Sequence, residues 1–219
     1  MKEMFRFLKI ESFKLFYKLK SWLGPMLIMI LVLTAFPLSI DISQFDLEKF
    51  YFSIIVVSLL MTSFLATEGM FEEDFEDGSL EQEFLVEQDF YKIVLSKIFI
   101  YVCFIGVPIA FIGAIFSFAN GVAIGSFMRV FFLLSLSNLL LFNLFAFGNA
   151  LSINKGAMLG VLTTLPLALP VIILLGTAIR SIQYEDGFLE ISSLMIGVSF
   201  LISAIMPLII STALKTHID

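Results

Sequence analysis

The acidic side chains of this chain are concentrated in one short stretch. Ten of the 19 carboxylates fall within residues 68–89, which read EGMFEEDFEDGSLEQEFLVEQD. Each carboxylate would cost roughly 2.5 kcal/mol or more in the hydrocarbon of a bilayer. Because the runs on both sides are strongly apolar, this stretch must lie in water at a membrane surface. Its chemistry is electrostatic: it can attract a partner that presents basic groups, and salt should weaken that association.

Residues that could catalyse a reaction or bind a metal are scarce. The only cysteine, Cys103, lies within an apolar run and is expected to be buried, and the only histidine, His217, lies near the C-terminus. They cannot supply a Ser-His-Asp or Cys-His set, nor Cys/His pairs for zinc or haem. The phosphate-binding sequence GxxxxGK[ST] does not occur, so the chain alone is not expected to hydrolyse ATP. We predict no catalytic residues and no metal site.

A helix is predicted within the acidic stretch. Residues 79–82 (SLEQ) fit the capping box S-x-x-Q, in which the Ser79 hydroxyl accepts a hydrogen bond from the Gln82 amide. Gly78 gives this helix a flexible start. The helix should be amphipathic, with an apolar stripe on one side and acidic side chains on another. The stripe consists of Leu80, Phe84 and Tyr91, and the acidic face of Glu83 and Glu87.

We interpret residues 68–92, called here the acidic segment, as a docking element for a basic partner. The alternative is a solvated linker whose charges only keep it out of lipid. The predicted cap, the apolar stripe and the charge together favour docking. The candidate docking residues are Glu72, Glu76, Asp77, Gly78, Ser79, Leu80, Glu81, Gln82 and Phe84.

The rest of the chain has the composition of a membrane protein. It is 59% hydrophobic with 26 Phe, whereas soluble domains are about 45–50% apolar. Six runs are long enough to cross a bilayer, and all should be helices because lipid offers no partner for free backbone groups. We therefore predict an all-α integral membrane protein with one membrane domain, 1–219. The predicted spans are 22–40, 50–67, 93–118, 130–151, 156–178 and 191–214.

The distribution of basic residues predicts the orientation of these spans. Six spans place both termini on one side of the membrane. With the basic N-terminus in the cytoplasm, ten of the 13 Lys and Arg residues fall on the inner side. This agrees with the positive-inside rule, to which acidic residues contribute little. The termini and the acidic segment are therefore expected in the cytoplasm.

Residues 3–20 have the pattern of an amphipathic helix that lies in the membrane interface. Apolar residues cluster on one face and basic residues on the other, toward anionic headgroups. Membrane lipids are thus predicted partners. The alternative is a frayed basic tail that only sets the topology. The apolar face is Phe5, Leu8, Leu15, Phe16 and Leu19, and the basic residues include Arg6, Lys9, Lys14 and Lys18.

Asn138, Asn143 and Asn149 are polar residues in the fourth predicted span. They could line a pathway or contact a neighbouring subunit, but hydrogen bonding between helices is the simpler role. The centres of all six spans lack ionisable residues, which argues against a proton-coupled carrier.

Four sequence features together are typical of one family: DGSLEQ at 77–82, KIVLSK at 92–97, the paired prolines of LPLALP at 165–170, and Phe147-Gly148-Asn149. With them the chain resembles the heme exporter protein B family, the permeases of the cytochrome c maturation ABC complex. The resemblance extends over nearly the whole chain. Glu83 replaces the usual Leu of the family and Val86-Glu87 replaces its Ser-Pro step, so the docking contacts should differ in detail.

The resemblance implies an ABC-2-like permease driven by a separate cytoplasmic ATPase that docks on the acidic segment as a coupling helix. It also implies a haem-handling membrane subunit and a haem chaperone as partners. ATP and haem would be bound by those partners and not by this chain, and no nucleic acid is expected. The location would be a bacterial inner membrane or the inner membrane of an organelle. Two alternatives are an ABC-2 permease that exports a lipid-linked glycan or drug, and a membrane scaffold without transport activity.

Overall fold

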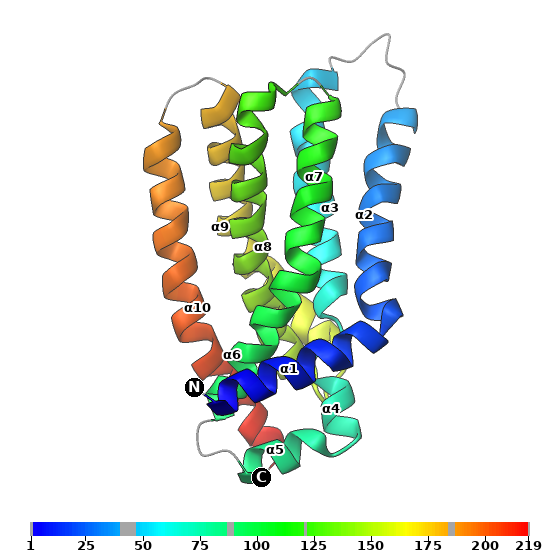
Figure 1. Ribbon diagram of the computed structural model, residues 1–219, viewed down its shortest axis with the longest axis vertical. Helices are drawn as coiled ribbons and strands as arrows, with labels where there is room; N and C mark the ends of the chain where they lie inside the picture. Colours follow the sequence, from blue (N-terminus) through cyan, green and yellow to red (C-terminus); the bar gives the residue numbers. More distant parts are fainter. Residues whose placement is uncertain (1, 40–46, 87–89, 121, 184–186, 219) are drawn as a thin grey trace.

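The computed structural model describes residues 2–39, 47–86, 90–120, 122–183 and 187–218. These residues form helices joined by turns. Six long helical segments run along the bundle, and three shorter helices lie near one end of it (Figure 1). The helices are α1 (Lys2–Tyr17), α2 (Leu19–Ser39), α3 (Leu47–Thr67), α4 (Glu72–Glu76), α5 (Ser79–Val86), α6 (Phe90–Tyr101), the π-helical turn η1 (Val102–Gly106), α7 (Val107–Ala119), α8 (Ile124–Ser152), α9 (Ala157–Gln183) and α10 (Phe188–Ile218).

Six helical segments in the described residues are long and apolar enough to cross a membrane. They are α2, α3, the continuous α6–η1–α7, α8, α9 and α10. Their outer surfaces carry many exposed Leu, Ile and Phe side chains, as expected where lipid is the solvent. The prediction of an all-α membrane protein with six spans is confirmed.

Helix α8 forms the centre of the bundle. It packs against α3, α7, α9 and α10, and its buried residues include Leu133, Leu134, Phe142 and Phe145. Its closest neighbour is α9, and two glycines explain the close approach. A Cβ atom on Gly148 would lie 2.4 Å from Thr164 Cγ2, and one on Gly160 would lie 2.5 Å from the Gly148 carbonyl oxygen. Small residues allow this contact between helices in a membrane.

The helices are generally longer than the predicted spans, because their polar ends continue beyond the apolar runs. The fifth span begins later than predicted: Gly156 has φ +87° and belongs to the turn before α9. Residue 40, the predicted end of the first span, lies outside the described residues. Cys103 was expected to be buried but is exposed, since it lies on the outer side of the π-helical turn η1.

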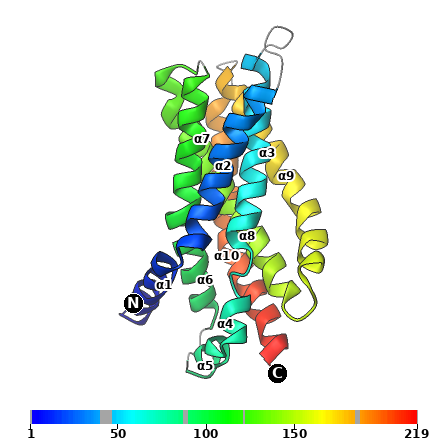
Figure 2. The same cartoon turned by 90° about the vertical axis from the view of Figure 1, so that its right-hand side faces the viewer.

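Both chain ends lie at the same end of the bundle as α4 and α5 (Figure 1). The view turned by 90° shows α1 projecting from the side of the bundle near this end, with α4 and α5 beside the final turns of α10 (Figure 2). The acidic segment and the N-terminal helix, far apart in sequence, are therefore brought to one end of the molecule.

Candidate functional site

The acidic segment folds into two short helices, α4 and α5, and not into the single helix that the sequence predicted. The turns before each helix contain Gly69 at φ +70° and Gly78 at φ +72°, a conformation that other residues rarely adopt. The run from Glu72 to Glu76, which precedes the predicted helix in sequence, forms the first helix. Residues 87–89 lie outside the described residues, and Tyr91 belongs to the membrane-spanning α6.

The cap of α5 differs from the predicted capping box. Ser79 is the first residue of the helix, so its hydroxyl points back and donates a hydrogen bond to the Asp74 carbonyl oxygen at 3.3 Å. The Asp77 carboxylate caps the helix by accepting from the Ser79 amide at 2.8 Å. The Gln82 amide donates to the Gly78 carbonyl at 3.3 Å. The hydrogen bonds from Ser79 lower the pKa of Asp77 below its usual value, so Asp77 is charged at neutral pH.

The outer surface of the two helices is acidic. Glu72, Glu76, Asp77 and Glu81 are all exposed, and Gln82 lies beside them. Leu85 is also exposed, at 82%. This surface can accept hydrogen bonds and attract cations at the end of the bundle, which is the property that the sequence assigned to the segment.

The apolar residues of α5 attach it to the bundle. Leu80 is buried, and the ring of Phe84 packs edge-on against Phe90 at 5.6 Å between ring centres. The ammonium group of Lys215, at the end of α10, lies 5.3 Å from the centre of the Phe84 ring. Leu80 and Phe84 therefore face the protein, while Glu81 and Gln82 between them face outward.

A buried group of charges lies behind this surface. Lys97 of α6 forms an ion pair with Asp74 of α4, and its ammonium lies 3.9 Å from the Glu11 carboxylate of α1. The three residues are only 4–5% exposed. The Phe71 ring covers the Lys97 ammonium, with its centre 5.4 Å away. We call Glu11, Lys14, Asp74, Glu83 and Lys97 the ion cluster.

Lys14 and Lys18 were predicted to face lipid headgroups, but both pair with the acidic segment. The Lys14 ammonium lies 3.2 Å from Asp74 and 4.0 Å from Glu83, and Lys18 pairs with Glu73. Burial alone would lower the pKa of Lys14, but the nearby Asp74 and Glu11 carboxylates outweigh it and raise that pKa. The acidic segment therefore supplies the negative charge that Lys14 and Lys18 face, in place of lipid headgroups.

Glu83 was expected on the solvated face of α5 but is mostly buried, with 19% of its side chain exposed. Burial raises its pKa above the usual value, although Lys14 and Lys97 oppose the shift. This is the residue that stands where the resembling family usually has Leu, and it brings a third carboxylate to the ion cluster.

Sequence reasoning missed Glu11 and Asp74, and it assigned no ion pair to Lys97, which it named only as part of the KIVLSK motif. A signal was present in α1: Glu11 lies between Leu8 and Leu15 on the side that packs against α6. A carboxylate on an apolar helix face predicts a cationic partner. Asp74 gave no comparable signal, because it is one of many carboxylates in its run.

Helix α1 has two apolar faces. Leu8 and Leu15 of the predicted apolar face pack inward, while Phe16 is 62% exposed beside Phe13 and Tyr17. Lys9 is exposed as well. The helix ends at Tyr17, earlier than predicted, because the chain turns at Lys18 to enter α2. The side chains of Phe5, Arg6 and Leu19 lie outside the part of the structure that is described.

The three asparagines of α8 make hydrogen bonds at different levels of the bundle. Asn138 accepts from Ser63 of α3 at 2.8 Å and donates to the Gly106 carbonyl at 2.6 Å. Asn143 donates to the Leu139 carbonyl in its own helix at 2.8 Å and lies 3.4 Å from the Ser203 hydroxyl of α10. Asn149 accepts from the Phe71 amide at 2.9 Å and so holds the start of the acidic segment. Asn138 and Asn149 thus join α8 to other parts of the chain.

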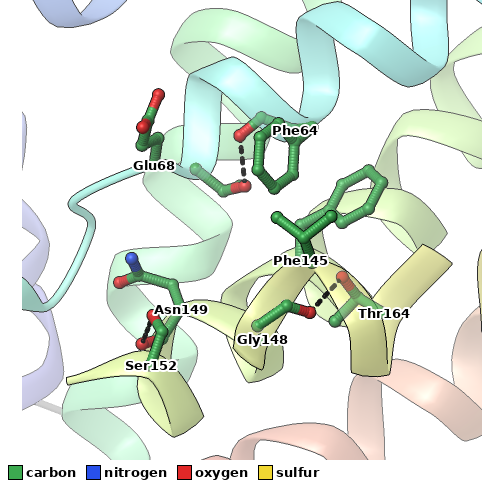
Figure 3. Close-up of a pocket in the computed structure, with 10 residues that line it drawn as sticks. Phe64, Glu68, Phe145, Gly148, Asn149, Ser152 and Thr164 are labelled. Carbon is green, nitrogen blue, oxygen red and sulfur yellow. Dashed lines mark hydrogen bonds between the residues drawn. The ribbon is translucent and has the colours of Figure 1, made fainter. Parts of the chain in front are cut away.

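A small pocket lies beside Asn149, between α3, α8 and α9 (Figure 3). Its free volume is about 20 Å³, enough for one or two water molecules. The rings of Phe64 and Phe145 meet edge to face at 5.5 Å on one side, and Glu68 lies at the rim (Figure 3). The pocket is too small for a haem or a nucleotide.

Fold and site together define a multi-pass membrane protein with an acidic, helical surface element at one end. A family model described as CcmB protein matches residues 7–217. The chain belongs to this family, which confirms the resemblance found in the sequence. It is 28% identical to heme exporter protein B of Haemophilus influenzae over 203 residues, 90% of each chain. It is 29% identical to heme exporter protein B of Pseudomonas aeruginosa over 173 residues, 78% of each chain.

Proposed function

We propose that this chain is the membrane permease subunit of an ABC transporter that handles haem for cytochrome c maturation. Family membership and the heme exporter relatives support the transporter class and the haem connection. The observation that carries the docking role is the exposed acidic surface of α4 and α5. A separate cytoplasmic ATPase would dock there through basic residues, and both chain ends would lie in the cytoplasm of a bacterial or organellar inner membrane.

In this proposal the chain transmits mechanical work and its partners carry the ligands. The ATPase binds ATP, and a haem-handling membrane subunit and a haem chaperone bind haem. A change in the ATPase can shift the permease between conformations only if the acidic surface is held more tightly in one of them. The resulting movement would release the haem-loaded chaperone from the membrane subunit.

Charge reversal tests the docking surface. Replacing Glu72, Glu76 and Glu81 together with Lys should abolish co-purification of the ATPase in mild detergent, because attraction becomes repulsion. The native complex should also lose ATPase as the salt concentration rises. Glu190→Lys is the matched control, since this exposed carboxylate lies at the start of α10, at the opposite end of the bundle (Figure 1). Undiminished co-purification of the triple variant would contradict docking at this surface.

A further inference from the structure

The third membrane span is divided by a weak point. The π-helical turn η1 separates α6 from α7, and Pro108, near the start of α7, lacks an amide hydrogen. Prolines and π-helical turns are the usual places where helices bend. The carbonyl of Gly106 in η1 accepts a side-chain hydrogen bond from Asn138. The span is thus held from the side at its weak point.

The two halves of this span have different neighbours. Helix α6 packs mainly on α1 and α10, with only a few contacts to α8, whereas α7 packs along α8 and touches α2 and α3. The division at η1 therefore coincides with a change of packing partner. Helix α7 is part of the central bundle, and α6 belongs with the elements at the end that carries the acidic segment.

The ion cluster binds these end elements to one another. Asp74 belongs to α4, Glu11 to α1 and Lys97 to α6, so the contacts of Lys97 with the two carboxylates join these three helices. Separating them would leave charges buried without partners, at a high energetic cost. Lys14 adds a direct ion pair between α1 and Asp74. The connection to α8 is weaker, since the hydrogen bond from the Phe71 amide to Asn149 is the one side-chain bond to α8 described for this segment.

We propose that α1, α4, α5 and α6 move as one lever about η1, and that Glu11, Asp74 and Lys97 are the positioning residues that hold the lever together. This inference rests on the proposed function, because the docked ATPase supplies the movement. Since α1 leads directly into α2, the lever passes a displacement of the acidic segment to the first span as well as to the third. The end of α10 follows through the contact of Lys215 with Phe84, helped by Pro207 within that helix.

The cohesion of the lever can be tested on the chain alone. In a Cys103→Ser background, two spin labels are attached at Phe13→Cys in α1 and Leu85→Cys in α5, both exposed positions. The distance between the two labels is measured in lipid nanodiscs. Asp74→Asn should broaden that distance distribution, because it removes the carboxylate that Lys14 and Lys97 share. Lys14→Met removes the contacts of Lys14 with Asp74 and Glu83, leaves Glu11 in place, and should broaden the distribution too. Glu76→Gln changes an exposed carboxylate of the same helix and should leave it unchanged. Narrow distributions for both cluster variants would overturn the proposal.

The movement is tested in the complex with an ATPase variant that binds ATP but cannot hydrolyse it. Distances are compared between the ATP-free and the ATP-bound complex. The distance from Phe13 to Leu85 lies within the lever and should stay the same. A third site at Met158, exposed on α9, should change its distance to Leu85. The proposal would be overturned if the Phe13–Leu85 distance changed as much as the Leu85–Met158 distance. It would also be overturned if the Leu85–Met158 distance did not change. Failure of the chain to bind any ATPase would contradict the proposed function, while the nanodisc measurement would still decide the cohesion of the lever.

Discussion

Lys97 is the only cation of the ion cluster that is almost fully buried, so the two buried carboxylates depend on it. Lys97→Met would leave Asp74 and Glu11 charged without that partner. We expect the free energy of unfolding in detergent to fall by about 3–5 kcal/mol. Lys155→Met changes an exposed lysine and should cost less than about 0.5 kcal/mol. Equal unfolding midpoints for the two variants would show that the cluster adds nothing to stability.

Glu83 gives a pH dependence of known sign. Because burial raises its pKa in the folded chain above the ordinary 4.5, the folded state binds this proton more tightly than the unfolded state. Its contribution to stability is present below pH 4.5 and is lost as the pH rises through the raised pKa. Glu83→Gln and Glu83→Leu should both remove this loss in thermal unfolding measured across pH. Glu81→Gln, on the exposed face, should keep the native pH profile. Identical profiles for all variants would contradict a buried Glu83.

At the scale of helices, the contact between α8 and α9 depends on glycine. An added methyl at Gly148 would collide with Thr164 at 2.4 Å, so Gly148→Ala should destabilise the fold by about 1–3 kcal/mol. Gly197→Ala is the control, because nothing lies within 4 Å of its Cβ position. That change should be neutral or slightly stabilising in the same detergent assay. A neutral Gly148→Ala would indicate that the two helices can separate without cost.

The outer apolar face of α1 should contact lipid. Spin labels at Phe13→Cys and Phe16→Cys, 58% and 62% exposed, should be accessible to oxygen dissolved in lipid and shielded from a water-soluble relaxation agent. A label at Ser12→Cys, on a less exposed part of the same helix, should be relaxed less by oxygen and should be less strongly shielded from the water-soluble agent. Preferential relaxation of the first two labels by the water-soluble agent would place α1 away from the membrane.

The long helices could be predicted from the sequence because each depends on a continuous apolar run, which is a local property. The exposed acidic surface could also be predicted from a local property, because a run of carboxylates is too costly to place in lipid. The ion cluster could not be predicted, since Glu11, Asp74 and Lys97 come together only after three helices have packed. The division of the acidic segment into two helices also depends on that packing: Asp74 is drawn inward to Lys97, and Gly78 then allows the chain to turn into α5.

At the scale of the whole molecule, the arrangement separates a lipid-exposed bundle from an end that gathers charge. The two chain ends, α1, α4 and α5 lie at that end (Figures 1 and 2). Only the cytoplasmic side of an inner membrane offers ATP to a docked ATPase, so the proposed docking requires this end to lie in the cytoplasm. The excess of Lys and Arg in the segments assigned to the inside supports the cytoplasmic side.

The most direct test is therefore the sidedness of α5. In a Cys103→Ser background, Leu85→Cys should react with a membrane-impermeant thiol reagent in inside-out vesicles and stay unlabelled in right-side-out vesicles. Ile124→Cys, 79% exposed at the first residue of α8, should show the reverse pattern, because α8 begins at the opposite end of the bundle (Figure 1). Labelling of Leu85→Cys from the outside would place the acidic segment beyond the reach of any cytoplasmic ATPase and would contradict the proposed function.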